Sequence, residues 1–331
     1  DHIEEVGLPH PTLDDLYESK PWSLQNQNRR NVARRILASR GMCECNTWSF
    51  LDHKKAKLFG GGETALTLSN PLSKELEMMR PSLLANLVAG AGRNKDRGLI
   101  NTSLFEVGAA YHTSFPQSQE MRISGVRSES HAPRHWLNKE RLVDLYDAKA
   151  DLFATLEACG INTEKVKIKT KAPSFFHPGR SGTVYQGPKN ILGVFGELHP
   201  QVLKDNDVEG IVVGFELYLD RLPLTKETHK KKLLKLSALQ PIHRDFAFLV
   251  DQGISAESLL QAAKKVDKSL ITEAHIFDVY EGKGVPEGKK SLAFTVTFEP
   301  FEKTLTDDEI NKLMDQIISA ITSETGGELR A

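Results

Sequence analysis

Hydrophobic and polar positions alternate most strictly near the C-terminal end of the chain. In SLAFTVTFE, large apolar side chains occupy every second position and smaller or polar ones lie between them. A period of two places successive side chains on opposite faces of a strand, so this segment predicts a strand with one buried face. The apolar positions are Leu292, Phe294, Val296 and Phe298.

The segments before this strand predict two more strands. RDFAFLV places Phe246, Phe248 and Val250 on one face. SLITEAHIFDVYEG then predicts a long strand, and KGVPEG makes the turn into the alternating segment.

Two helices and a short last strand complete this block. SAESLLQAAKKV begins with Ser255 as its N-cap. TDDEINKLMDQIISAITSETGG begins with a capping box from Thr306 to Glu309 and ends at Gly326 and Gly327. With ELRA as the last strand, the order β-α-β-β-α-β predicts a ferredoxin-like fold. Both helices cover one face of its sheet, and we expect the other face to be open to a partner.

The first 220 residues mix helices and strands irregularly. Helices are predicted at about 24–40, 73–94 and 141–159, with a short one near 200. The predicted strands are 43–50, 103–112, 120–128, 165–170, 182–186, 190–197 and 211–219. This pattern is typical of an α+β fold with mostly antiparallel strands, and it fits a Rossmann fold poorly.

The periodic patterns break in LPLTKETHKKKLLKLSALQP, where Pro223 and Pro241 flank a basic run at Lys230, Lys231 and Lys232. We therefore predict three parts: a first domain over 1–222, a basic linker over 223–240 and the ferredoxin-like domain over 241–331.

Composition adds few constraints. The chain has 331 residues, is 39% hydrophobic and carries a formal net charge of -1, which is ordinary for a globular protein and does not indicate a general nucleic-acid binder. No apolar run approaches the roughly 18 residues that a membrane helix needs, so we expect no membrane. Cys43, Cys45 and Cys159 are an odd number without C-x-x-C spacing, which indicates reduced thiols and a cytoplasmic location.

Three motifs invite a catalytic interpretation that their residues do not support. FFHPGRSG places His177, Arg180 and Ser181 on a predicted Pro-Gly turn between strands, but no third group is present to orient a general base. GVFGELHP, with Glu197 and His199, is more typical of a tight turn. LFGGGE lacks the Lys-Ser/Thr of a phosphate loop. We favour structural roles, and the residues alone reveal no active site.

The first ten residues, DHIEEVGLPH, raise a different question. Asp1, Glu4 and Glu5 fall at i, i+3 and i+4, so on a helix their like charges share one face and repel each other. The spacing alone favours a solvated acidic turn. The sequence also begins without Met or a polar lead-in, from which we expect an upstream part to be missing.

The first 220 residues contain, in order, the phrases RRNVARRILASRGMCECNTWSF, LSNPLSKELEMMRPSLLANLVAGAGRN, SLFEVGAAYH, LVDLYDAKADLFATLEACG, FFHPGRSGTVY, ILGVFGELHPQVL and FELYLDRL. Together they resemble the C-terminal half of the bacterial phenylalanyl-tRNA synthetase β subunit. The last block, with QPIHRDFAFLV, IFDVYEGKGVPEGKKSLAFTVTF, TLTDDEI and GGELRA, resembles that family's ferredoxin-fold anticodon-binding domain.

The resemblance implies an inactive core built on the class II synthetase antiparallel sheet. ATP and phenylalanine would be bound by a separate α subunit, in a heterotetramer of two α and two β subunits that acts on tRNA-Phe. The family's editing parts and its N-terminal tRNA-binding barrel lie upstream of this sequence. The resemblance also implies that 24–60 and 73–95 face the α subunit, with Leu37 and Leu83 as test positions.

The resemblance also changes the interpretation of the acidic start. In the family, a segment ending in Asp-x-x-Glu-Glu contributes to a magnesium site shared with the α subunit, and DHIEE matches it at Asp1, Glu4 and Glu5. Mg²⁺ prefers oxygen ligands and usually takes one or two carboxylates plus water. One family ligand lies upstream of Asp1.

Basic and aromatic residues of the last block suggest an RNA surface. Phosphates bind Lys and Arg, and unpaired bases stack on aromatic or guanidinium planes. The alternative is that charged turns merely solubilise a sheet edge; as a set, beside the basic linker, they favour RNA contact. The predicted tRNA-binding residues are Arg244, Tyr280, Lys283, Lys289, Lys290 and Arg330.

A second function class stays open at the level of sequence. Ferredoxin-like domains also bind amino acids, and a fold does not decide a function. The chain is therefore either an inert subunit of a tRNA ligase or a regulator that senses an amino acid.

Overall fold

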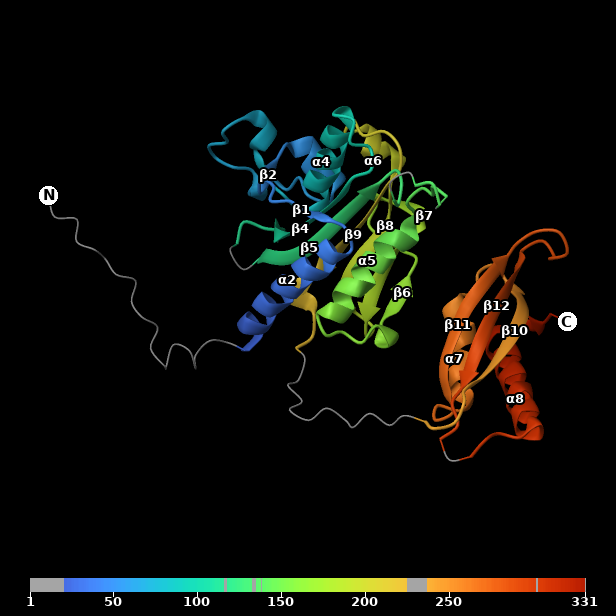
Figure 1. The fold of residues 1–331 in the computed structure, drawn as a ribbon. Coiled ribbons are helices and arrows are strands. Elements are labelled where there is room, and N and C mark those ends of the chain that lie inside the picture. The colour runs from blue at the N-terminus through green and yellow to red at the C-terminus, as the bar shows by residue number, and fades with distance from the viewer. Residues whose placement is uncertain are drawn as a thin grey trace. The chain divides into compact units, whose positions relative to one another are not determined.

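The computed structural model describes residues 21–115, 118–132, 135–137, 139–224, 237–301 and 303–330, with side chains from residue 24 onward. The chain divides into two compact units, Asp1–Glu227 and Thr228–Ala331 (Figure 1).

The first unit is built on a seven-stranded sheet with the order β1-β4-β5-β9-β8-β7-β6. Only β1 and β4 pair in parallel; every other neighbouring pair is antiparallel. This confirms the α+β fold class and excludes a doubly wound parallel sheet. The strands are β1 (Cys43–Glu44), β4 (Ser103–Tyr111), β5 (Gln119–Ser128), β6 (Lys167–Lys169), β7 (Phe176–Gln186), β8 (Asn190–Leu198) and β9 (Val212–Tyr218).

Helices cover both faces of this sheet (Figure 1). On one face, α2 (Pro21–Ser39) and α5 (Leu145–Ala158) contribute Leu37 and Leu152 to a core with Phe105 and Phe215. The other face packs against α4 (Leu84–Asp96), α6 (Pro200–Lys204) and α3 (His53–Leu58). The remaining short elements are β2 (Phe50–Leu51), β3 (Met78–Met79) and 3-10 turns at Thr64–Leu66, Lys74–Leu76, Thr163–Lys165 and Leu219–Arg221.

Two predicted elements of this unit are shorter than expected. The helix predicted over 73–94 begins only at Leu84, because Met78 and Met79 pair with Leu51 and Phe50 in a two-stranded antiparallel sheet and Pro81 follows without an N–H. The strand predicted over 43–50 is interrupted, since only Cys43–Glu44 pairs with β4. Both segments are apolar enough to look periodic, but their partners lie far away in sequence.

The helix predicted over 141–159 begins at Leu145, where Asp144 is the N-cap. The Asp144 carboxylate accepts from the N–H groups of Tyr146 and Asp147, and the Asp147 carboxylate accepts in return from the Asp144 N–H. This reciprocal capping box fixes the first turn.

The second unit has the predicted ferredoxin-like order. Its sheet runs β11-β12-β10-β13, entirely antiparallel, from β10 (Ile242–Asp251), β11 (Ile271–Tyr280), β12 (Lys289–Phe298) and β13 (Glu328–Leu329). α7 (Ala256–Val266) and α8 (Asp307–Thr325) share one core with the sheet, and Ser255 and the Thr306–Glu309 capping box begin them as predicted. Gly326 ends α8 with φ +68°.

The two residues chosen to test the α-facing surface, Leu37 and Leu83, are wrong for that purpose because they are buried. Leu37 and Leu83 are both 0% exposed and lie in the interior, where a partner cannot reach them. The exposed apolar residues nearby are Leu24 and Trp48, at 53% and 66%.

Within the described ranges, no helix is long and apolar enough to span a bilayer. Cys43 is exposed, Cys45 half-buried and Cys159 buried, and all three are free thiols. Burial raises the pKa of the Cys159 thiol to about 11.

Candidate functional site

The face of the second sheet opposite α7 and α8 is uncovered by helices, and we call it the open face. Residues paired across an antiparallel sheet share a face, so the register identifies its members. They are His243, Asp245, Ala247, Leu249, Asp251, Glu273, His275, Asp278, Tyr280, Lys289, Ser291, Ala293, Thr295, Thr297 and Glu328, with Arg330 following by alternation.

Three small residues form a shallow floor on the open face, between two large side chains. Ala247, Ser291 and Ala293 lie on the two central strands. Tyr280 extends from β11 on one side, and the Arg330 guanidinium reaches from the other side to 5.9 Å from the Tyr280 ring centroid. This distance is within the range of a cation–π contact. Two of the predicted RNA-binding residues therefore meet above this floor, and Leu249, which pairs with Ser291, is the larger apolar residue beside it.

The β11–β12 turn fixes the Tyr280 ring. The Tyr280 hydroxyl donates to the backbone oxygen of Lys283 at 3.2 Å. A Cβ at Gly282 would lie 3.0 Å from the Tyr280 oxygen and 3.2 Å from its Cζ, so glycine leaves room for the ring. Tyr280 as a whole residue is 40% exposed, which leaves it accessible to a stacking partner.

The lysines divide between the two faces. Lys289 lies on the open face and pairs with Glu328 at 3.4 Å. Lys290 has the alternation of Leu292 and Phe294, which face the helices, and its Nζ donates to the backbone oxygen of Gln252 at 3.0 Å. Of the two adjacent lysines, only Lys289 belongs to the open face.

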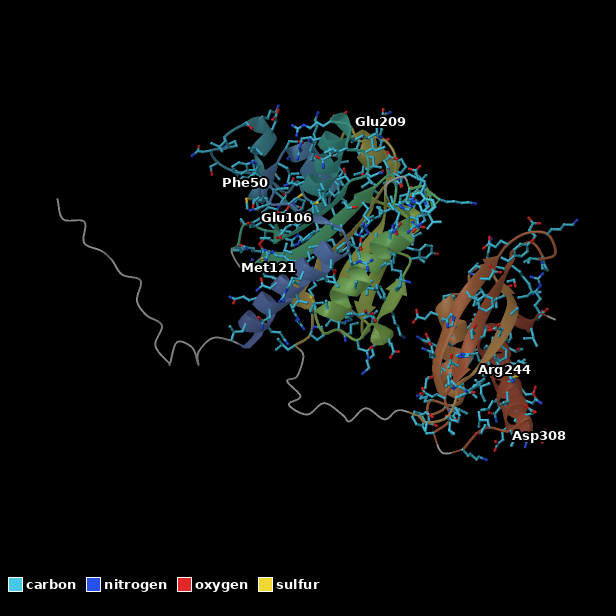
Figure 2. All side chains as sticks on the ribbon, viewed as in Figure 1. Phe50, Glu106, Met121, Glu209, Arg244 and Asp308 are labelled. Atoms are coloured by element: carbon cyan, nitrogen blue, oxygen red, sulfur yellow. The ribbon has the colours of Figure 1, made fainter. Side chains whose placement is uncertain are left out.

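Arg244 lies away from the other predicted residues. It pairs with Val296 and has the alternation of Phe246, so it does not belong to the open face. Six positions separate Arg244 from Val250, the partner of Lys290, which is about 20 Å along a strand. Figure 2 shows Arg244 near the end of the unit that carries Asp308, whereas Figure 1 shows the β11–β12 turn at the opposite end. The structure gathers Tyr280, Lys283, Lys289 and Arg330, and not Arg244.

Carboxylates are more numerous on the open face than the sequence prediction considered. Asp245 accepts from the Thr295 hydroxyl at 2.6 Å. The others are Asp251, Glu273, Asp278 and Glu328. Negative charge repels phosphate, so this face suits an uncharged base better than a run of backbone phosphates. The alternation of the strands could have revealed these residues.

In the first unit, a network of polar groups closes the sheet under α4. Glu216 is 1% exposed and accepts from the Ser82 hydroxyl at 2.8 Å, from the Leu83 N–H at 3.0 Å and from the Ser124 hydroxyl at 2.9 Å. Arg122 also donates to it at 2.5 Å. Nearby, Arg80 pairs with buried Glu106, which is labelled in Figure 2. These contacts hold the start of α4 against the sheet.

The edge of this network includes Glu120, whose carboxylate contacts Arg122, Arg221 and His112. These hydrogen bonds and positive charges lower the pKa of Glu120 to about 2, against the opposing effect of burial.

FFHPGRSG does not form a turn between strands, which corrects that prediction. His177, Arg180 and Ser181 lie within β7, across an irregularity in its pairing with β8. The Ser181 hydroxyl donates to the backbone oxygen of His177 at 2.7 Å, and the His177 Nδ1 accepts from the Gly179 N–H. The serine is therefore not hydrogen-bonded to the imidazole as a nucleophile to its base, in agreement with the structural interpretation.

The predicted magnesium ligands, Asp1, Glu4 and Glu5, and the basic run at Lys230, Lys231 and Lys232 lie outside the described residues. Among the residues that the structure does describe, no group of three or more His, Cys, Asp or Glu side chains could hold a metal ion.

Two family models match the chain. One, the phenylalanyl tRNA synthetase beta chain CLM domain, matches residues 17–219, and the other, the ferredoxin-fold anticodon binding domain, matches residues 237–330. This chain belongs to the phenylalanyl-tRNA synthetase β chain family. The two matches coincide with the two compact units of the structure.

Curated relatives of the family match along nearly the whole chain. The phenylalanine–tRNA ligase β subunit of Paramagnetospirillum magneticum is 45% identical over 100% of this chain and 41% of the relative. Those of Bradyrhizobium diazoefficiens and Rhodospirillum rubrum are both 48% identical, over 99% and 100% of this chain and 42% and 41% of the relatives. The chain thus spans about two fifths of the length of these β subunits.

Proposed function

We propose that the chain serves as the C-terminal part of the β subunit of phenylalanine–tRNA ligase. In this role it supports a catalytic α subunit and binds the anticodon region of tRNA-Phe during ATP-dependent aminoacylation. The observation that carries the RNA part is the pair Tyr280 and Arg330 above the floor of Ala247, Ser291 and Ala293.

The chemistry of this pair suits an unpaired base. Aromatic rings and guanidinium groups both offer planes on which bases stack, and such stacking is sequence-tolerant because every base has a π-face. Ala247, Ser291 and Ala293 carry small side chains near Tyr280, with Leu249 as an apolar neighbour, while the surrounding carboxylates and hydroxyls offer polar contacts to a base edge. Lys283 and Lys289, near the β11–β12 turn, are left to contact phosphates. Arg244 and Lys290 lie off this face, so we propose no base contact for them.

The division of labour with the α subunit completes the proposal. ATP and Mg²⁺ are assigned to the α subunit, with Asp1, Glu4 and Glu5 as shared magnesium ligands, in a heterotetramer of two α and two β subunits. The role of the first unit is then to present a rigid surface. The polar network around Glu216 supports this role, because its groups are used to fix α4 against the sheet.

Titration of the whole chain with an anticodon stem-loop tests the RNA part. We expect Tyr280→Ala to weaken binding by about 1 to 3 kcal/mol while leaving the salt dependence nearly unchanged, since stacking releases few counterions. Lys289→Ala should instead flatten the slope of log affinity against log salt by about 0.7 to 0.9. Phe301→Ala is the matched control, because Phe301 is 49% exposed but lies outside the sheet.

Equal binding by all of these variants would exclude the open face as the RNA surface. Calorimetric titrations of the chain with phenylalanine and with the RNA test the alternative that the chain is a regulator. If the chain binds the free amino acid and does not bind RNA, it is an amino-acid sensor, and the ligase-subunit proposal is wrong.

A further inference from the structure

Two motifs without an assigned role, FFHPGRSG and GVFGELHP, come together where β7 meets β8. Phe176 pairs with Leu198 and Ser181 with Gly196. Gly196 has φ +156°, and a Cβ there would lie 2.5 Å from the Ser181 Cβ, so the two strands approach too closely for any side chain. A bidentate ion pair joins the motifs, with Arg180 donating to both oxygens of Glu197 at 2.5 and 2.8 Å.

The histidines of the two motifs stack. The rings of His177 and His199 are 26° from parallel, with centroids 6.5 Å apart. Each ring accepts a backbone N–H at its Nδ1, from Gly179 and from Gln201, both at 3.1 Å. A neutral imidazole that accepts at Nδ1 carries its proton at Nε2. Each ring therefore has an Nε2–H donor, and neither donor has an acceptor among the described residues.

A cavity of about 720 Å³ adjoins His199 and is lined on one side by α3. Lys54 and Lys57 of α3 line it, together with Ser174. Neither lysine makes an ion pair or hydrogen bond within the described residues, although Asp52 caps their helix and pairs with Lys55. The one carboxylate in the lining, Asp205, is bound by the Gln201 side-chain amide at 2.8 Å. The lining thus combines the apolar side chains of Leu58 and Val202 with two lysines and a histidine N–H that have no partner among the described residues.

We propose that this cavity binds a phosphate of an RNA backbone, with Lys54 and Lys57 supplying charge and the His199 Nε2–H a hydrogen bond. Lysine ammonium groups bind phosphate as point charges, and neutral N–H donors fix its position. His177 acts as a positioning residue, since its ring packs against that of His199. The inference rests on the proposed function for the source of the RNA, but it concerns a surface separate from the open face.

The alternative is that the lysines of a short exposed helix are solvated, and the salt dependence of binding separates the two. Whole tRNA-Phe is titrated into the whole chain at several salt concentrations. Removing both lysines, Lys54→Ala with Lys57→Ala, is expected to flatten the slope of log affinity against log salt by about 1.5. The same change should weaken the affinity about tenfold. His199→Asn is expected to weaken binding severalfold; asparagine also caps helices, so the local fold is kept while the Nε2–H is lost.

Matched controls remove equal charge elsewhere in the same unit. Lys165→Ala with Lys189→Ala takes away two exposed lysines that do not line the cavity. If this pair and the Lys54/Lys57 pair have the same slope while Tyr280→Ala weakens binding, the cavity is not an RNA site, although the proposed function stands. If the Lys54/Lys57 variant binds RNA more weakly while Tyr280→Ala binds as the wild type does, the cavity is an RNA site and the open face is not. No binding of RNA by the wild-type chain would overturn both.

Competition with inorganic phosphate and with poly-glutamate tests whether the cavity binds a free anion or an acidic protein instead of RNA. We expect each to compete with tRNA weakly, and equally for the wild-type chain and the control pair. If phosphate protects the chain thermally through Lys54 and Lys57 but RNA affinity does not depend on them, the site is one for a free anion. Strong competition by poly-glutamate through the same lysines would assign it to an acidic protein, and either result overturns the inference.

Discussion

Single residues in the first unit combine charge with nearly complete burial, and Glu216 is the clearest case. Its carboxylate satisfies four donors from two elements that are distant in sequence. A buried carboxylate is tolerated only when it is paired and hydrogen-bonded. If it is removed, its former partners become buried polar groups without a hydrogen bond, and they carry the desolvation cost instead.

We therefore expect Glu216→Ala to lower the free energy of unfolding by about 3 to 5 kcal/mol, because Arg122 would be left as a buried charge without its main partner. Denaturant unfolding measures the change. Glu209→Ala provides the control, since Glu209 is an exposed residue at the surface of the same unit (Figure 2), and should change the value by less than about 0.5 kcal/mol. A loss no larger than that of the control would show that the network is dispensable.

The start of α5 gives a prediction for pH. The Asp147 carboxylate is faced by Arg141, His131 and the Asp144 backbone, and these lower its pKa to about 2 although burial opposes the shift. A depressed pKa stabilises the fold above the unfolded value near 4, and this contribution disappears as the pH falls toward 2. Asp147→Asn should thus cost about 2 kcal/mol at pH 7 and progressively less between pH 5 and 2.

Unfolding curves of the wild type and of Asp147→Asn across this pH range test the sign. A difference that grows as the solution becomes more acidic would contradict the assignment.

At this scale the sequence was informative about caps with a simple signature, such as Thr306 to Glu309, but not about Glu216. Its partners Ser82 and Ser124 are 134 and 92 positions away, and no local pattern connects them.

At the scale of elements, alternation was a better guide than periodicity over short apolar runs. The strict period of β12 predicted its buried face correctly, since Leu292, Phe294, Val296 and Phe298 are all at most 1% exposed. The same alternation also assigns Lys290 to the helix side and Arg244 to the side of Phe246. The predicted RNA set overlooked this information because it grouped residues by charge rather than by face.

The short elements were predicted wrongly for a different reason. The antiparallel pair of β2 and β3 has two residues in each strand, and its formation depends on segments about 28 positions apart. Such pairs are stabilised by the tertiary core and not by local preference, so Met78 and Met79 were absorbed into a predicted helix.

The surface of α2 and the segment after it provides a prediction for the partner subunit. Leu24 and Trp48 are exposed apolar residues within the range expected to face the α subunit, and burying them in an interface would be favourable. Leu24→Asp combined with Trp48→Glu should leave the free energy of unfolding within about 0.5 kcal/mol and weaken association with the α subunit at least tenfold. Co-purification of the two chains measures the second effect.

Leu72→Asp is a suitable control for this pair, because Leu72 is 85% exposed and lies outside both of the segments assigned to that interface, 24–60 and 73–95. Unchanged association for the double variant would place the α subunit elsewhere.

At the scale of the whole molecule, each unit has hydrophobic clusters of its own. The clusters of the first unit draw on residues between Ala33 and Leu222, and the cluster of the second on residues between Ile242 and Ile321. In the sequence, Pro223 and Pro241 interrupt the apolar pattern, and the bounds 1–222, 223–240 and 241–331 drawn from this interruption stay a prediction. The sequence could not predict which residues of each unit form a site, since that depends on register and on contacts between distant segments.

Separate clusters predict separate responses to core truncation. Phe248→Ala, at a fully buried site of the second unit, should destabilise that unit by about 3 to 5 kcal/mol and leave the transition of the first unit in place. Glu216→Ala should have the converse effect. Differential scanning calorimetry of the two variants measures both transitions, and a joint shift of the two in either variant would contradict the prediction.

The floor of Ala247, Ser291 and Ala293 has a consequence for how sequences of this kind can diverge. Its side chains face away from the hydrophobic cluster, so larger residues there would not disturb the packing of Phe246, Phe248 or Phe294 on the other side of the same strands. Mutation at the half-buried Ala247 and Ala293 can therefore reshape the surface near Tyr280 at little thermodynamic cost, whereas Ser291, at 5% exposed, has less room. Selection on RNA recognition and selection on folding act on alternate positions of β10 and β12, and a lineage can retune the first without compromising the second.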